Sequence, residues 1–188
     1  VDIYGPQIVQ AALAIPDARV VYKPHPRVVA SPDPLIRANH KKLVSLIAAA
    51  GAQHLYLPTA DILGILPETD LLIADVSSVT LDHLYLAPDS PIILTDRRSD
   101  SDQLHADSPV SAACAVIDQS SINGINELIT TSLETDAHRS DRESMRSYYF
   151  GNTEQHSSTG AFWSAIATEI AAHDAALQGI QRVRQVGS

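Results

Sequence analysis

The stretch that decides the fold is residues 70–82, which have the sequence DLLIADVSSVTLD. Its first half is a short apolar run that ends at Asp75, and such runs are typical of buried strands in parallel sheets. Its second half opens with Ser77 and Ser78, either of which can cap the helix that we expect over 77–86. A strand that leads directly into a helix predicts a βα unit.

The same alternation continues on both sides of this unit. We expect strands over 19–23, 54–57, 91–94 and 113–117, helices over 7–14 and 34–50, and a helical turn or two over 60–66. The chain from residue 121 onward is expected to be helical, with breaks near Gly151 and Gly160. This order predicts an α/β fold, a Rossmann-like parallel sheet with helices on both faces, in one domain over 1–188.

Composition narrows the classes of function. The 188 residues carry a formal net charge of −9 and no lysine- or arginine-rich run, which argues against nucleic-acid binding. No apolar stretch approaches the length needed to span a bilayer, and no secretory signal is visible. The only cysteine, Cys114, lies in an apolar run and is interpreted as a small buried residue. These features favour the cytoplasm.

A second informative stretch is Lys23-Pro24-His25-Pro26, at the end of the strand expected over 19–23. Its two prolines stiffen the loop and hold Lys23 and His25 in one arrangement at low entropic cost. Both side chains can donate to phosphate oxygens, and His25 can also transfer a proton near neutral pH. The alternative is a stiff turn with a surface lysine and a histidine bonded to the backbone.

The loop over 75–82 offers a complementary anion site. The first amides of the expected helix, its positive end and the hydroxyls of Ser77 and Ser78 can bind phosphate. Asp82, one turn later, can accept hydroxyl hydrogens from a ribose or glycerol, and Arg97 follows the next strand at the same edge. The alternatives are a capped helix with Asp82 on a solvated face and a solvated loop at Arg97. Because parallel strands end at one edge of a sheet, the two loops together predict a diphosphate site.

The other basic residues allow fewer inferences. His54 lies in an expected strand and is interpreted as structural, and His83 as surface packing near the site. Arg139, Arg142 and Arg146 have near-helical spacing and fit either a cleft or a solvated face. The remaining histidines have no partner at a useful spacing: His40, His105, His138, His156 and His173.

Residues 23–26 and 70–82 resemble the paired signature of the CDP-glycerol glycerophosphotransferases, the primases and polymerases of teichoic acid synthesis. More weakly, 146–150 and 157–166 are similar to that family's closing segment. The resemblance implies the C-terminal, donor-binding half of a GT-B fold, with His25 as the catalytic residue and Lys23, Ser77, Ser78 and Asp82 as donor ligands. Arg97 is added to this set because of its place after the next strand, not by the resemblance. The helices from about residue 136 would pack against an N-terminal domain that this sequence lacks. No cofactor is implied, although a divalent cation can accompany the diphosphate.

The chain departs from the family pattern at three places. Val76 stands where the family has tyrosine, Leu81 where it has phenylalanine, and 152–156 where it has an aspartate-glycine pair. The expected partners are CDP-glycerol, or another nucleotide-diphosphate donor, and a membrane-linked polymer acceptor bound through the missing region. Such an acceptor would hold the full-length protein at the inner face of the cell membrane. Two alternatives stay open: a GT-B glycosyltransferase or epimerase that uses a UDP-sugar, and a non-catalytic domain retained for assembly.

Overall fold

The computed structural model describes residues 3–151 and 157–186. The described chain divides into two compact units, Val1–Tyr149 and Phe150–Ser188. The first unit is a mixed α/β structure of short parallel sheets flanked by helices, and it carries every residue of the predicted site. The second unit contains α8 (Ser157–Val186). Whether 1–188 acts as a single domain remains a prediction.

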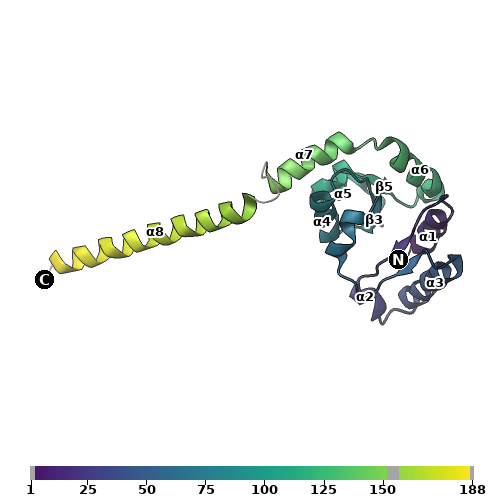
Figure 1. The fold of residues 1–188 in the computed structure, drawn as a ribbon, viewed down its shortest axis with the longest axis horizontal. Helices are drawn as coiled ribbons and strands as arrows, with labels where there is room; N and C mark the ends of the chain where they lie inside the picture. Colours follow the sequence, from purple (N-terminus) through teal and green to yellow (C-terminus); the bar gives the residue numbers. More distant parts are fainter. Residues whose placement is uncertain (1–2, 152–156, 187–188) are drawn as a thin grey trace. The chain divides into compact units, whose positions relative to one another are not determined.

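The first unit follows the predicted alternation of strands and helices (Figure 1). Its elements in chain order are α1 (Gly5–Leu13), β1 (Val21–Tyr22), α2 (Pro26–Val29), α3 (Pro34–Ala50), β2 (Leu55–Tyr56), η1 (Ile62–Gly64), η2 (Leu66–Glu68), β3 (Leu72–Asp75), α4 (Ser78–Leu86), β4 (Ile92–Thr95), α5 (Ser101–Asp107), η3 (Pro109–Ala113), β5 (Ala115–Ile117), η4 (Ile122–Gly124), α6 (Ile125–Thr135) and α7 (Arg139–Phe150).

The strands form two sheets in place of the single sheet that we expected. β1 and β2 pair in parallel, with Tyr22 opposite Tyr56, and β3, β4 and β5 form a separate parallel sheet in that order. Proline explains why the first sheet is so short: Pro24 and Pro58 follow its two strands closely and have no amide hydrogen to donate to a ladder. Within residues 3–151, no strand pairing joins the two sheets.

α1 connects the two sheets through the core. Val9 of α1 packs with Leu43 and Ile47 of α3 over the first sheet. The opposite side of α1 packs on α6 and contributes to the cluster around Ile93 and Ile117 of the second sheet. Figure 1 shows α6, α1 and α3 in succession along one side of this unit. The two sheets are therefore held together by helix packing and not by hydrogen bonds between their strands.

Helix boundaries agree with the sequence signals in two cases and differ in a third. Asp33 caps α3 by accepting from the amides of Leu35 (2.7 Å) and Ile36 (3.3 Å), and Gly51 ends it with φ of 121°. α7 ends before Gly151, as predicted, but the break expected at Gly160 is wrong because α8 runs through that residue. A glycine costs a helix only about 1 kcal/mol relative to alanine, and the alanines around Gly160 favour helix. No helix among the described residues has the length and apolar character needed to cross a bilayer.

Candidate functional site

Lys23 joins the loops that follow the two strands of the first sheet. Its half-buried side chain places Nζ 3.3 Å from the carbonyl oxygen of Pro58, after β2, and 3.4 Å from that of Pro24. An ammonium group has three hydrogens, so one remains for a ligand when the other two bind these carbonyls. Lys23 thus has a structural role that the sequence did not reveal, beside the predicted binding role.

His25 occupies the N-cap position of α2, and its ring is bonded to the backbone. The Nδ1 atom accepts a hydrogen bond from the amide of Arg27 at 3.1 Å. An accepting Nδ1 places the hydrogen of the neutral ring on Nε2. Because His25 is exposed, this arrangement presents a donor of fixed tautomer at the end of β1. The structure confirms the backbone-bonded histidine that we considered as an alternative, and the binding role of His25 stays a prediction.

The second predicted loop leads from β3 into α4. Ser77 has extended backbone angles at the N-cap position, but its side chain makes no capping hydrogen bond, so the predicted cap by its hydroxyl is wrong. Ser78 is the first residue of the helix. Both serines are exposed, and Asp82 is half-buried one turn further along α4. An N-terminus without a side-chain cap leaves its first amides to water or to a ligand.

A carboxylate that we did not single out lies beside this loop. Asp75, the last residue of β3, accepts a hydrogen bond from the Oγ1 of Thr95 at the end of β4. Asp75 is exposed and lies two residues before Ser77. Its negative charge opposes a bare phosphate, so a diphosphate bound here would need a cation or the basic groups of the first loop to offset it.

The loop after β4 is organised by Asp96, which is buried. Its Oδ1 accepts from the amide of Arg98 at 3.0 Å and its Oδ2 from the amide of Asp100 at 2.8 Å. Arg98 is paired with Asp107 of α5 at 2.8 Å, and this hydrogen-bonded pairing lowers the pKa of the Asp107 carboxyl. Arg97 is exposed on this fixed turn, at the carboxyl edge where it was predicted.

One segment connects the surroundings of the two predicted loops. The carbonyl of Pro58, which binds Lys23, begins the connection that leads from β2 through η1 and η2. α4 packs against both η1 and η2. The Lys23 loop and α4 therefore contact the same stretch of chain, from Pro58 to Glu68, which gives a common support to Lys23 and to the helix that carries Ser78 and Asp82.

A cluster of three rings beside Lys23 was not predicted from the sequence. His40 of α3 contacts both Tyr22 and Tyr56, with its Nδ1 2.9 Å from the hydroxyl of Tyr22 and its Nε2 3.4 Å from that of Tyr56. Burial raises the pKa of the Tyr22 hydroxyl, and the neighbouring Tyr56 raises it further. The helical spacing of His40 with the buried Leu43 and Ile47 is the signal that places His40 on the inner face of α3.

The three arginines of α7 bind the first unit itself. Arg142 is fully buried, and its guanidinium donates to both carboxylate oxygens of Asp136 (2.7 and 2.5 Å) and to the carbonyl of Pro88 (3.0 Å). Arg139 pairs with Asp89 at 2.5 Å, and Arg146 stands over the ring of Tyr85. From the sequence we considered that Arg142 lines a cleft or lies on a solvated helix face. Both interpretations are wrong, because the Arg142 side chain is buried and its charge is neutralised by Asp136 inside the fold.

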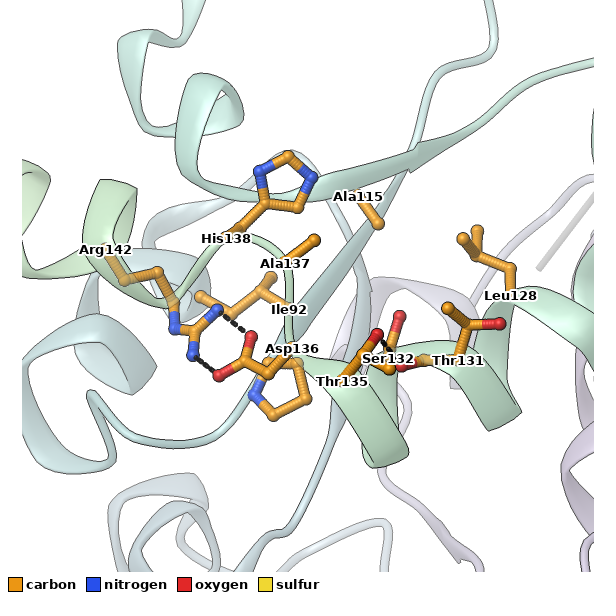
Figure 2. A pocket seen from close by; sticks show the side chains of 11 residues that line it. Ile92, Ala115, Leu128, Thr131, Ser132, Thr135, Asp136, Ala137, His138 and Arg142 are labelled. Carbon is orange, nitrogen blue, oxygen red and sulfur yellow. Dashed lines mark hydrogen bonds and ion pairs between the residues drawn. The ribbon is translucent and has the colours of Figure 1, made fainter.

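Two cavities lie at the opposite edge of the second sheet, where its strands begin. The smaller, about 80 Å³, is lined by Ile92, Ala115 and Leu128 with the Arg142–Asp136 pair in its wall (Figure 2). The larger, about 420 Å³, is lined by four carboxylates and one arginine: Asp70, Asp89, Glu134, Asp136 and Arg139. Ligand cavities usually measure about 300–1,000 Å³, so the first is too small for a nucleotide. The second has the wrong charge for a diphosphate, and we therefore keep the carboxyl ends of β1 and β3 as the candidate site. The prediction that the loops after these strands share one sheet edge is wrong, because β1 and β3 belong to separate sheets.

Comparison with known proteins adds no assignment: no family model, curated protein or solved structure matches this chain. Among the described residues, no three His, Cys, Asp or Glu side chains are grouped as metal ligands. The departure from the family pattern at 152–156 falls outside the residues that the structure describes.

Proposed function

We propose that this chain is the donor-binding domain of a transferase that uses a nucleotide-diphosphate donor, with CDP-glycerol as the first candidate and a hydroxyl of a cell-wall polymer as acceptor. The observation that carries the proposal is the pair of loops after β1 and β3. One presents His25 with a fixed tautomer beside Lys23, and the other presents a helix N-terminus whose serine hydroxyl is not used for capping. The family resemblance of residues 23–26 and 70–82 supplies the identity of the donor.

The proposed roles follow from the chemistry of the groups. Lys23 and the Nε2–H of His25 would donate to the phosphate nearer the nucleoside, and the amides and hydroxyls at Ser77 and Ser78 to the other phosphate. Asp82 would accept from a sugar or glycerol hydroxyl, and Arg97 would approach the diphosphate from the loop after β4. Lys23 and His25 are held by backbone hydrogen bonds before the donor arrives, which lowers the cost of organising this part of the site.

The reaction would be a displacement at phosphorus. The acceptor oxygen forms a bond to the phosphorus that carries glycerol, the bond from that phosphorus to the bridging oxygen breaks, and CMP leaves with the bonding electrons. The acceptor proton passes to a base that, by the family resemblance, belongs to a second domain of the GT-B fold and not to residues 1–188. Charge accumulates on the departing CMP, where Lys23 and His25 stabilise it, so removing either group should lower turnover as well as donor affinity.

Calorimetric titration with CDP-glycerol, CMP and UDP-glucose tests the proposal, on this chain and on the full-length protein. Cytidine ligands should bind selectively, and His25→Ala combined with Ser78→Ala should abolish that binding. His138→Ala is the matched control, because His138 lies at the opposite edge, where it pairs with Asp141. A preference for UDP-glucose would move the assignment to a glycosyltransferase. Absence of binding by the full-length protein would refute the proposal.

A further inference from the structure

α8 exposes large apolar side chains along one continuous helix. Its 30 residues correspond to a length of about 45 Å. The side chains of Phe162, Trp163, Ile170 and Leu177 are between 45% and 63% exposed. Every side chain described from Ser158 to Leu177 is exposed. In proteins most of the stability of a helix comes from packing of its apolar face, so we look for a surface that covers these side chains.

The spacing of the apolar residues identifies that partner as another helix. Trp163, Ile166, Ile170, His173 and Leu177 follow one another at intervals of three, four, three and four residues, the a and d positions of a heptad. The sequence continues this spacing to Ile180. A helix that lies on a globular surface has a wider stripe with a period of 3.6, whereas a strict 3.5 repeat is typical of a coiled-coil seam.

Charges beside the seam decide the orientation of two identical helices. In a parallel pair in register, Glu169 at a g position lies against Asp174 at the e position of the other helix, and these like charges repel. In an antiparallel pair with full overlap, Glu169 and Asp174 lie against alanines of the other helix, Ala176 and Ala167. The antiparallel arrangement also opposes the two helix dipoles.

The antiparallel arrangement makes the seam self-complementary. Ile166 lies against Leu177 of the second helix, and Ile170 against His173, with the reciprocal contacts generated by the twofold axis. A helix of this length can be treated as a cylinder about 45 Å long and about 10 Å wide. If one third of its surface is covered, each helix buries about 500 Å². The pair then buries about 1,000 Å² in total, which reaches the lower bound for a specific interface. We propose that α8 is covered by α8 of a second copy of this chain, as an antiparallel two-stranded coiled coil.

Sedimentation velocity of the 188-residue chain over a wide concentration range tests the association. The chain should sediment as a dimer with twice the mass of the 20.2 kDa protomer. Ile166→Asp combined with Ile170→Asp should give a monomer. The matched control, Ser164→Asp with Thr168→Asp, adds the same charge at b and f positions away from the seam and should remain a dimer. A monomeric wild type, or equal loss of association in both variants, overturns the proposal.

Disulfide cross-linking tests the orientation separately. A mixture of Ile170→Cys and His173→Cys chains should form cross-linked heterodimers, because these positions meet across the antiparallel seam. Ile170→Cys alone would cross-link efficiently only if two a positions faced each other in a parallel pair, and that result overturns the antiparallel arrangement. The native Cys114 is buried and hydrogen-bonded to Val110, which keeps it out of the reaction. This inference is independent of the proposed transferase function.

Discussion

Replacing Arg142 with methionine should destabilise the first unit strongly. Arg142→Met keeps a long apolar side chain but removes both bonds to Asp136 and the bond to the carbonyl of Pro88. Removing one partner of a buried ion pair costs about 3–5 kcal/mol, because the other charge stays buried without compensation. The Asp136 side chain is 19% exposed, so water can solvate it in part. We therefore expect the free energy of unfolding to fall by about 3 kcal/mol, near the lower end of this range.

Urea unfolding followed by far-ultraviolet circular dichroism measures this loss. With a slope of about 1.5–2 kcal/mol per molar urea, the midpoint should fall by roughly 1.5–2 M. The matched control is Arg139→Met, whose pair with Asp89 is largely exposed and should contribute at most about 1 kcal/mol. Tryptophan fluorescence is unsuitable here because Trp163 lies in α8 of the second unit. Equal losses for the two variants would refute the argument that Arg142 anchors α7 by a buried ion pair.

Three further predictions concern stability. Burial lowers the pKa of His83 to about 4, so the native state binds fewer protons than the unfolded chain between about pH 6.5 and 4. The free energy of unfolding should therefore decrease as the pH is lowered through this range, by up to about 1.4 kcal/mol per pH unit, and His83→Leu should reduce that slope in urea titrations at several pH values. Gly51→Ala should cost about 1–3 kcal/mol, because φ of 121° is strained for any side chain; a midpoint equal to that of wild type would contradict this. Tyr22→Phe removes the hydrogen bond to His40 and should cost about 1 kcal/mol in the same assay, whereas an unchanged midpoint would show that the bond is not net stabilising.

Local signals predicted the elements well because short-range chemistry decides them. The apolar run over 71–74 indicated β3, and the proline after Asp33 together with Gly51 bounded α3 within a residue. The same signals placed Lys23, His25, Ser77 and Arg97 at strand ends. α5 was not predicted, because its seven residues carry little apolar periodicity and its beginning depends on a cap, the bond from the amide of Gln103 to Asp100.

The sequence by itself determined that the chain is α/β, where most strands and helices lie, and which residues follow the strands. Only the tertiary structure decided that the strands divide into two sheets, that His40 binds two tyrosines, and that Arg142 is buried against Asp136. The physical reason is the range of the interactions. Propensity, capping and proline geometry act within a few residues, whereas burial and charge pairing depend on which helices pack together, and α1 and α7 make those contacts with segments distant in the chain.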